Sequence, residues 1–438
     1  MFQDKVEVDV YMKIVIMAGG KGTRIASVNS EVPKPMIQIL GKPILQYQVE
    51  SLRAQGFQEF IIVIGHRGEI IQEYFKDGSD YGIKIDYIVE KEPLGTAGAL
   101  YFLKNEINED FLLINGDIIF DINVQRFLDY HKEKKGLVTL FTHPNSHPYD
   151  SGIIQANDGK VINWLHKEDE RLWYRNRVNA GIHLISPRLL DMFSEPKKMD
   201  LDRDVLKPLI SKGELYAYDS PEYVKDMGTP DRYYAVIEDI KKGKVKAKNL
   251  SNKQRAVFLD RDGTLNKYVG FLTKTEELEL LDGVAEAVKM INESGMLAII
   301  VTNQPVIARG EIDWKELNNI HNKLETLLGN DGAYIDAIYC CPHHPDKGFE
   351  GERVEYKIDC DCRKPKPGLI MKAAQDFNVD LQKSWMVGDS LNDIYAGVNA
   401  GCKTALIGCM NLENAPELKE TPQYRNLLEF VKSNIREG

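Results

Sequence analysis

Two long segments of this chain repeat one pattern, in which a short apolar run ends in Gly or Asp and is followed by an amphipathic stretch of helical length. This alternation is typical of strands that form a parallel sheet and are connected by helices packed on its faces. The sequence therefore predicts an α/β fold with two domains. The two segments do not align with each other, so we do not interpret them as copies of one repeat.

The same pattern gives the approximate positions of the elements. In the first segment we expect strands at 13–18, 60–65, 84–89 and 111–116, and helices near 43–55 and 96–104. In the second segment we expect strands at 256–260, 297–303, 384–389 and 403–408, and a helix at 283–294.

The stretch between the two segments, 241–255, is rich in Lys and Asn and poor in large apolar residues. Such a composition cannot bury itself in a core, so we expect an unburied linker. We place the domain boundary near residue 248, which gives an N-terminal domain at 1–247 and a C-terminal domain at 248–438.

The charge balance narrows the classes of partner. Among its 438 residues the chain has 56 Lys and Arg against 66 Asp and Glu, a formal net charge of −10. Binding to nucleic acid or to an anionic membrane needs a basic surface, so we expect neither as a partner. No apolar run approaches the roughly 18 residues of a membrane span, and the first residues lack the pattern of a secretory signal. We expect a cytoplasmic protein that binds small phosphorylated substrates; a homo-oligomer remains possible.

A glycine-rich loop follows the first expected strand. MAGGKGTR places Gly19, Gly20 and Gly22 just before Arg24. Glycines let backbone N–H groups approach phosphate oxygens, and an arginine can bind the same anion through two donors. The spacing matches neither a Walker A loop nor the dinucleotide-binding GxGxxG pattern. Taken alone, this loop is better explained as a tight strand-to-helix turn.

Further motifs strengthen the functional interpretation of this segment. Lys34 lies between two prolines, and GTAGAL is a second loop that exposes its backbone. NGD and DMGTP bring Asp117 and Asp226 to expected strand ends. The ends of parallel strands are where such sheets bind ligands, and two carboxylates can hold Mg²⁺ on a nucleotide triphosphate.

Six motifs, GGKGTR, PKPM, GTAGA, NGD, NAGIHLI and DMGTP, occur here in the order of the sugar-phosphate nucleotidyltransferase family, which residues 13–245 resemble. The resemblance implies a Rossmann-like fold and a reaction in which a sugar 1-phosphate oxygen attacks the α-phosphorus of a nucleotide triphosphate and expels pyrophosphate. Such chemistry needs positioning and charge neutralisation rather than a protein nucleophile. The text around GTAGAL and NGD looks most like the heptose or mannose 1-phosphate guanylyltransferases.

The resemblance also assigns roles to individual residues. Arg24 and Lys34 would be the catalytic cations, and Asp117 and Asp226 the Mg²⁺ ligands. Lys167 would hold the sugar phosphate, although the family usually has Glu-Lys where this chain has His166-Lys167. The remaining substrate-binding positions are Gly19, Gly20, Gly22, Gly95, Thr96, Asn179 and Gly181.

The second segment has its own group of polar motifs. DRDGTLN sets Asp260 and Asp262 two residues apart at the end of an expected strand, where one carboxylate can attack and the other can move protons. A calcium loop would also be rich in Asp, but the spacing of an EF-hand is missing. Other polar residues follow at later strand ends and in RKPKPG, namely Thr302, Asn303, Arg363, Lys364, Asp389 and Asp393.

DRDGTLN, TNQ, CRKPKPG and GDSLND occur in the order of the haloacid dehalogenase superfamily of phosphatases, which residues 254–410 resemble. The resemblance implies that Asp260 is the nucleophile that becomes an aspartyl phosphate. Asp262 would protonate the leaving alcohol and then deprotonate water. Phosphoryl oxygens would be held by Thr302 and Lys364, with Asn303 beside them.

The same resemblance implies a magnesium site and a substrate contact. Asp260, the backbone carbonyl of Asp262, and Asp389 would bind Mg²⁺, with Asp393 behind them, and Arg363 would bind a second anionic group of the substrate. Too few residues separate the first two motifs for a large cap domain, so we expect loops to set specificity. The related branch has TNQSGIARG where this chain has Pro305 and Val306, which predicts a stiffer loop.

Four of the six cysteines cluster in the last third of the chain. CPHHP supplies Cys341 and His343, and CDC supplies Cys360 and Cys362. Two such pairs form a closed set of four ligands, the arrangement of a structural zinc site. A chance cluster of buried thiols is the weaker alternative, and Cys340 could replace Cys341. This loop resembles that of the heptose 1,7-bisphosphate 7-phosphatase and histidinol-phosphate phosphatase families.

The two resemblances imply consecutive reactions on one chain. A heptose bisphosphate 7-phosphatase produces heptose 1-phosphate, and the N-terminal family consumes a sugar 1-phosphate, so we expect GTP and heptose phosphates as substrates and GDP-heptose as the product. Two alternatives stay open. One is a mannose or other hexose 1-phosphate nucleotidyltransferase fused to a histidinol-phosphate-type phosphatase. The other is a regulatory nucleotide-sugar-binding domain fused to an active phosphatase.

Overall fold

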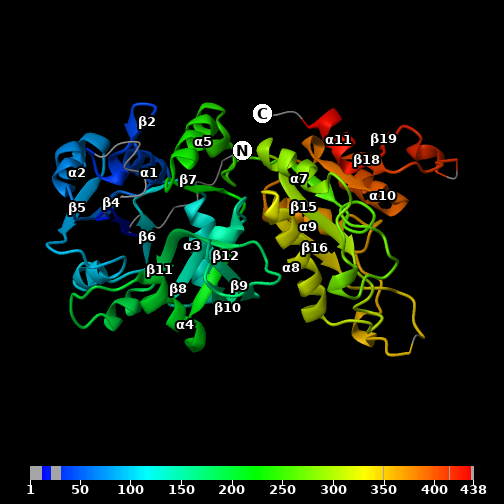
Figure 1. Ribbon diagram of the computed structural model, residues 1–438, viewed down its shortest axis with the longest axis horizontal. Helices are drawn as coiled ribbons and strands as arrows, with labels where there is room; N and C mark the ends of the chain where they lie inside the picture. The colour runs from blue at the N-terminus through cyan, green and yellow to red at the C-terminus, as the bar shows by residue number, and fades with distance from the viewer. Residues whose placement is uncertain (1–11, 21–30, 349, 414, 436–438) are drawn as a thin grey trace, which may run out of the picture. The chain divides into compact units, whose positions relative to one another are not determined.

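The computed structural model describes residues 12–20, 31–348, 350–413 and 415–435, which form two compact units (Figure 1). The first unit comprises Met1–His143, Ile154–Trp164 and Asn179–Asn249. The second unit comprises Pro144–Ile153, Leu165–Val178 and Leu250–Gly438. Both units contain a sheet with helices on its faces, which confirms the predicted α/β class.

A nine-stranded sheet forms the centre of the first unit, in the order β5-β4-β1-β6-β11-β8-β12-β10-β9. Strands β5, β4, β1 and β6 are parallel, and β11 runs antiparallel to β6. The strands are β1 Ile14–Met17, β4 Glu59–Ile64, β5 Lys84–Val89, β6 Phe111–Asn115, β8 Val138–His143, β9 Ile153–Asn157, β10 Lys160–Leu165, β11 Val178–Ile185 and β12 Leu215–Asp219.

Helices cover both faces of this sheet because successive strand side chains point to opposite sides. Ile14 and Ile16 of β1 pack with α1, α2 and α3, whereas Val15 packs with the 3-10 helix Gly98–Leu103 and with α4. The helices of the unit are α1 Ile44–Arg53, α2 Gly68–Phe75, α3 Val124–Lys134, α4 Lys207–Lys212, α5 Pro230–Lys241 and α6 Lys244–Ala247.

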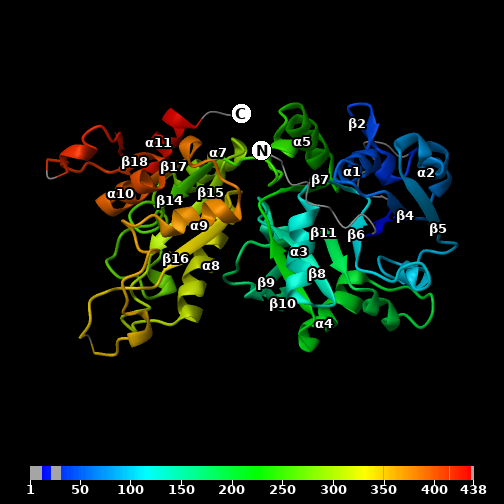
Figure 2. The same ribbon diagram turned by 180° about the vertical axis from the view of Figure 1, so that it is seen from behind.

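A parallel six-stranded sheet forms the centre of the second unit, in the order β16-β15-β14-β17-β18-β19. Helices α7, α8 and α11 pack on one face, and α9 and α10 on the other (Figure 2). The elements are β14 Ala256–Leu259, α7 Val284–Glu293, β15 Leu297–Asn303, α8 Trp314–Asn330, β16 Ala337–Cys341, α9 Gly368–Asp376, β17 Trp385–Gly388, α10 Leu391–Ala400, β18 Lys403–Ile407, β19 Gln423–Tyr424 and α11 Leu427–Asn434.

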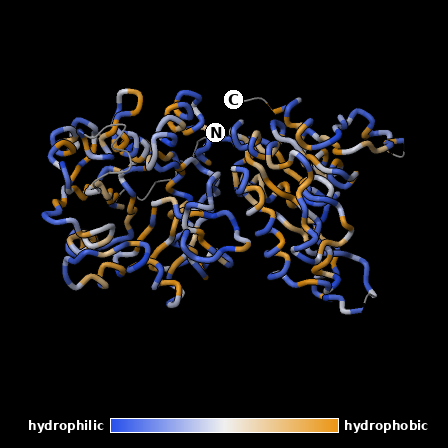
Figure 3. Tube along the Cα trace, in the orientation of Figure 1, coloured by the Kyte–Doolittle hydropathy of each residue, from blue (hydrophilic) through white to orange (hydrophobic). Residues whose placement is uncertain are grey.

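Hydrophobic residues run along the central strands of each unit, and the loops at its border are mostly hydrophilic (Figure 3). This distribution matches the buried cores of the two sheets. Among the described helices, none combines the length and the apolar composition that a bilayer span requires.

Two expectations about local structure were wrong. The predicted helix at 96–104 is a 3-10 helix over Gly98–Leu103, because glycine and close backbone packing replace a regular amphipathic face there. The predicted unburied linker at 241–255 is largely ordered against its neighbours. Leu250 is 4% exposed and Gln254 is 3% exposed, and Gln254 exchanges backbone hydrogen bonds with residues 378 and 380. The buried side chains of Val245 and Leu250 and the backbone hydrogen bonds of Gln254 anchor this lysine-rich stretch.

Candidate active sites

The first candidate site lies where β1 and β6 end in the first unit. Lys34 begins the 3-10 helix Lys34–Met36 and is only 9% exposed. Its Nζ donates a hydrogen bond to Oδ2 of Asp117 over 2.5 Å. Asp117 follows β6 in a turn held by Gln48, whose buried amide donates to the carbonyl oxygens of Asn115 and Ile118. The strand end, the turn and the proline-flanked helix together fix a cation against a carboxylate.

A two-stranded ribbon brings the second predicted Mg²⁺ ligand to the same place. Strands β7 (Ile118–Asp121) and β13 (Tyr223–Asp226) are antiparallel and pair Asp226 with Ile118. The amide of Met227 donates to the carbonyl oxygen of Asp117 over 3.1 Å. Arg232 Nη1 donates to both carboxylate oxygens of Asp226, over 2.9 and 2.7 Å. Burial alone would raise the pKa of Asp226, but Arg232 holds that pKa below its usual value.

Asn179 and Gly181 lie on β11, the neighbour of β6 in the sheet. The Asn179 Oδ1 accepts hydrogen bonds from the Gly181 amide and from Nε2 of His183, over 3.2 and 3.1 Å. Burial lowers the pKa of His183 to about 3, so its ring is neutral. Gly181 has a φ of +74°, and a side chain there would collide with the amide of Asn115. This strand end therefore packs directly against the turn that carries Asp117.

Gly95 and Thr96 are exposed and join two distant parts of the first unit. Gly95 has a φ of +78° and bridges to Met199, whose carbonyl a side chain would hit. The Thr96 hydroxyl accepts a hydrogen bond from the Leu201 amide over 2.7 Å. Gly19 follows β1, and a side chain there would collide with the carboxylate of Glu90. The loops that contain Gly95 and Gly19 therefore pack so closely against Met199 and Glu90 that a side chain at either glycine would collide with them.

Four further residues were predicted for the first site. Gly22 and Arg24 lie outside the described residues. Lys167 is exposed in the turn after β10 and belongs to the second unit. Gly20 is exposed near the end of the described stretch 12–20.

The second candidate site lies at the carboxyl edge of the sheet in the second unit. Asp260, Thr302 and Asp389 come at the ends of β14, β15 and β17, which are neighbours in this sheet. Because parallel strands all end at one edge, the sheet itself collects these side chains. Gly263 has a φ of +79°, and a side chain there would collide with the carboxylate of Asp389.

A buried lysine lies between two carboxylates at this edge. Lys364 is 3% exposed, and its Nζ is 2.7 Å from Oδ1 of Asp260 and 2.6 Å from Oδ1 of Asp393. Burial alone would lower the pKa of Lys364, but the two carboxylates hold it above its ordinary value. Burial and the nearby Asp393 raise the pKa of Asp260 to about 7 and that of Asp389 to about 6.

These three carboxylates can share one cation. A ligand oxygen of each of Asp260, Asp389 and Asp393 lies within 4.8 Å of the others. Three carboxylates beside one lysine carry an excess of negative charge in a buried place, and the raised pKa values are the consequence. A divalent cation with a preference for oxygen ligands fits this donor set. The carboxylate of Asp262 is not part of this group.

A cavity of about 340 Å³ opens above these residues. Asn303 fixes one wall, since its side chain exchanges hydrogen bonds with both backbone groups of Lys364. Arg363 lines another wall, and its Nη1 donates to the carbonyl oxygen of His343 over 3.1 Å. Pro305 and Val306 also line the cavity and accept backbone hydrogen bonds from residues 309 and 311.

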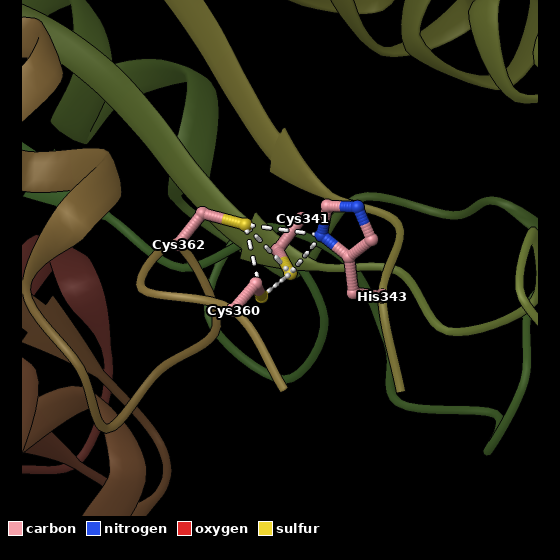
Figure 4. Close-up of side chains that lie close together, drawn as sticks. All are labelled: Cys341, His343, Cys360 and Cys362. Atoms are coloured by element: carbon pink, nitrogen blue, oxygen red, sulfur yellow. Dashed lines mark hydrogen bonds between the residues drawn. The ribbon is translucent and has the colours of Figure 1, made fainter. Parts of the chain in front are cut away.

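The four predicted zinc ligands come together in the second unit (Figure 4). Cys362 Sγ lies 3.2 Å from Cys341 Sγ, 3.1 Å from Cys360 Sγ and 3.2 Å from Nδ1 of His343. Such a compact set of three thiols and one imidazole can hold a metal ion. The structure places Cys341, and not Cys340, in this cluster, because neighbouring residues of β16 point to opposite sides of the sheet.

Several residues beside the two sites escaped the sequence analysis. Arg232 and Gln48 in the first unit and Arg261, His321 and Gln304 in the second all contact a predicted site residue or its turn. Arg261 and Gln304 had a signal, since Arg261 stands between the two carboxylates of DRD and Gln304 ends the TNQ motif. Gln48, Arg232 and His321 lie on helices outside the quoted motifs, so only the fold reveals them.

Comparison with known proteins identifies both halves. A family model described as nucleotidyl transferase matches residues 13–243, more than half of the chain. A model described as haloacid dehalogenase-like hydrolase matches residues 207–401. The chain belongs to both families. It therefore combines a nucleotidyltransferase and a phosphatase in one bifunctional enzyme.

Relatives of each half are known. A D-glycero-beta-D-manno-heptose-1,7-bisphosphate 7-phosphatase of Haemophilus ducreyi is 41% identical over 155 residues, which cover 35% of this chain and 82% of that protein. A mannose-1-phosphate guanyltransferase of Yarrowia lipolytica is 31% identical over 225 residues, which cover 50% of this chain and 61% of that protein, less than two thirds of its length. The crystal structure of HddC from Yersinia pseudotuberculosis with GMP-PN is 27% identical, with a TM-score of 0.46, and covers 52% of this chain and 99% of that one.

Proposed function

We propose that this enzyme carries out two consecutive steps of nucleotide-heptose synthesis. The phosphatase removes the 7-phosphate of D-glycero-D-manno-heptose 1,7-bisphosphate. The nucleotidyltransferase then transfers a guanylyl group from GTP to heptose 1-phosphate, which yields GDP-heptose and pyrophosphate. We assign the transferase to residues 1–247 and the phosphatase to residues 248–438.

One observation carries the choice of substrate. The phosphatase half is 41% identical to a heptose bisphosphate 7-phosphatase over 82% of that protein, and it is joined to a nucleotidyl transferase. The product of such a phosphatase is a sugar 1-phosphate, the kind of acceptor that a sugar nucleotidyltransferase uses. The presence of both activities on one chain is explained if the product of the phosphatase is the substrate of the nucleotidyltransferase.

In the phosphatase, Asp260 attacks the 7-phosphorus and the bond to the sugar oxygen breaks. Lys364 and Thr302 hold the phosphoryl oxygens, with Asn303 fixing the backbone of Lys364. Asp262 gives its proton to the leaving sugar oxygen and later takes one from the water that releases phosphate. Arg363, fixed by the carbonyl oxygen of His343, binds the remaining phosphate of the substrate at the cavity wall.

In the transferase, the chain positions two phosphorylated substrates and neutralises their charge. Lys34, held on Asp117, lies beside the triphosphate together with Arg24. Gly19, Gly20 and Gly22 let the backbone approach the phosphates. We assign binding of the nucleoside to Gly95 and Thr96 and binding of the sugar to Asn179 and Gly181, and the role of Lys167 in holding the sugar phosphate is a prediction from its motif.

Two metals fit the donor sets. Mg²⁺ would be held by Asp117 and Asp226 in the transferase and by Asp260, Asp389 and the backbone carbonyl of Asp262 in the phosphatase, where it would neutralise phosphoryl charge. Zn²⁺ would be held by Cys341, His343, Cys360 and Cys362, where it would fix the loop that carries Arg363.

Separate assays of the two half-reactions test the proposal. The purified enzyme with Mg²⁺ should release phosphate from heptose 1,7-bisphosphate, tested as both anomers, faster than from histidinol phosphate. It should release pyrophosphate from GTP with heptose 1-phosphate faster than with mannose 1-phosphate or with other nucleotide triphosphates. A preference for histidinol phosphate and mannose 1-phosphate would overturn the heptose assignment, and the absence of any transfer would favour a regulatory first domain.

The similarity to mannose-1-phosphate guanyltransferases makes mannose 1-phosphate the second candidate for the transferase alone. Both candidate reactions use GTP as the guanylyl donor and differ only in the sugar phosphate. The assays described above vary the sugar phosphate and the nucleotide triphosphate separately, so they test the two choices independently.

A further inference from the structure

Arg261 separates the two carboxylates of the DRD motif and is completely buried in the second unit. Its backbone amide donates a hydrogen bond to Oδ1 of Asp260 over 2.8 Å. Burial of a guanidinium costs free energy unless its N–H donors are hydrogen-bonded. The hydrogen-bond partners of Arg261 therefore indicate which groups this side chain positions.

The guanidinium of Arg261 binds the carboxylate of Asp262 through two nitrogen atoms. Nε of Arg261 donates to Oδ1 of Asp262 over 3.1 Å, and Nη2 donates to Oδ1 over 3.0 Å and to Oδ2 over 2.8 Å. A planar guanidinium that meets a carboxylate through two of its nitrogens fixes the plane as well as the position of that carboxylate. A lysine at this position would supply the charge without that plane.

His321 holds the other end of the guanidinium. It lies on α8, and its Nε2 is 3.1 Å from Nη1 of Arg261. Arginine can only donate, so the imidazole must accept and must be neutral. Burial, with the nearby Arg261, lowers the pKa of His321 to about 3, which agrees with a neutral ring. The guanidinium is therefore fixed between a helix and a carboxylate.

Two amides complete the environment of Asp262. Asn266 Nδ2 donates to Oδ1 over 2.9 Å, and Gln304 Nε2 donates to Oδ2 over 2.8 Å. The side chain of Asp262 is still 18% exposed, and the residue lines the cavity. The carboxylate is thus held in one orientation while it faces the space that a substrate would fill.

We infer that Arg261, supported by His321, is a positioning residue that aims Asp262 at the leaving oxygen of the phosphate ester. The inference rests on the phosphatase function proposed above, with Asp262 as acid and base. When Asp260 attacks phosphorus, the ester oxygen leaves with its bonding electrons and takes the proton of Asp262. In the second step water attacks phosphorus, Asp262 takes a water proton, and the carboxylate of Asp260 is released. Small misplacement of a proton donor costs much of its effect.

The dependence on the leaving group separates positioning from a merely structural role. A sugar alkoxide needs a proton as it leaves, whereas p-nitrophenolate leaves without one. In Arg261→Lys we expect kcat/KM for heptose 1,7-bisphosphate to fall about 100-fold, within the range of general acid catalysis, and kcat/KM for p-nitrophenyl phosphate to fall less than about 5-fold. Asp262→Asn should show the same selectivity.

Two further variants sharpen the test. His321→Gln keeps an acceptor for Nη1 and should remain close to wild type, whereas His321→Leu should share the selective loss. Arg177→Lys is the matched control, because Arg177 is also a buried arginine of the second unit, paired with Glu325 over 3.2 Å. It should leave the ratio of the two kcat/KM values unchanged.

Equal losses on both substrates in Arg261→Lys, with the selective loss retained in Asp262→Asn, would overturn the positioning role. If wild type hydrolyses p-nitrophenyl phosphate but no heptose phosphate, the substrate assignment fails instead, and any alkyl phosphate that it does hydrolyse replaces heptose bisphosphate in the comparison. Thermal unfolding of each variant identifies losses that come from poor folding.

Discussion

Lys364 in the second unit and Lys34 in the first are both buried lysines, but their carboxylate partners differ in exposure. The side chains of Asp260 and Asp393 beside Lys364 are 13% and 0% exposed, whereas that of Asp117 beside Lys34 is 34% exposed. A carboxylate that must form a covalent bond has to be desolvated and fixed in advance. A site that only brings two substrates together can stay open, because the substrates complete its charge balance.

The pKa shifts follow the same contrast. Burial and the nearby Asp393 raise the pKa of Asp260 to about 7. Arg232 holds the pKa of Asp226 below its usual value, although that carboxyl is also partly buried. The phosphatase site is thus short of positive charge until a cation binds, and the transferase carboxylate already has a cation beside it.

Removal of the nucleophile should have the largest effect. In Asp260→Asn we expect phosphate release to fall at least ~10³-fold, because Asp260 is the residue that we propose as the nucleophile. Nucleotidyl transfer to heptose 1-phosphate should stay at the wild-type rate. Asp331→Asn, an exposed aspartate of the second unit, is the control. A variant that loses both activities would contradict two independent sites.

The open site should tolerate substitution better. Asp117→Ala removes the partner of Lys34 but leaves Asp226 in place, so we expect nucleotidyl transfer to fall about 100-fold, the scale of losing one charge-stabilising group. Phosphate release should not change. Asp86→Ala, whose side chain is 54% exposed in the same unit, serves as the control. A fall as large as that of Asp260→Asn would mean that the two sites depend equally on one carboxylate.

Metal removal should act on one unit only. Cys362→Ser breaks the cluster that lies beside the loop of Arg363, and we expect phosphate release to fall about 10-fold with a higher KM, in line with the loss of a supporting metal ligand. Zinc content and the thermal midpoint of the second unit should fall together. The exposed Cys409→Ser controls for loss of a thiol. Unchanged metal content in Cys362→Ser would exclude the cluster as the metal site.

The smallest effect concerns a half-buried carboxylate outside both sites. Burial, with Asp200 nearby, raises the pKa of Asp202 to about 6. The folded state keeps a proton that the unfolded state loses near pH 4, so stability falls as the pH rises from about 4 to about 6. Asp202→Asn should therefore stabilise the first unit at pH 7 and not at pH 4, measured by urea unfolding. An equal effect at both pH values would show that the carboxylate is solvated.

Most of the fold could be predicted because strand patterns and motifs are local. The expected strand at 297–303 is β15 itself, and the expected helix at 283–294 contains α7. The predictions of a regular helix at 96–104 and of an unburied linker at 241–255 were wrong, because tertiary packing determines the local structure of both segments. Met199 packs against the loop at Gly95, and residues 378 and 380 bind Gln254. Neither partner is visible in the sequence near the element that it changes.

The same distinction holds for the sites. Residues in motifs at strand ends, such as Asp260 and Asp389, could be predicted to meet because one sheet edge collects them. Arg232 and His321 could not, since each reaches its partner from a helix whose sequence shows only an ordinary amphipathic pattern. Lys167 could be assigned by motif alone, and its role in sugar phosphate binding remains a prediction.

The proposed function makes the two activities consecutive on one chain. The most direct test incubates the wild-type enzyme with heptose 1,7-bisphosphate, Mg²⁺ and GTP, and follows phosphate, pyrophosphate and the mass of the nucleotide sugar in time. We predict that one phosphate is released before each pyrophosphate. The nucleotide sugar that accumulates should be GDP-heptose that no longer carries the 7-phosphate. Phosphate release with no nucleotide sugar, from GTP or any other nucleotide triphosphate, would contradict the claim.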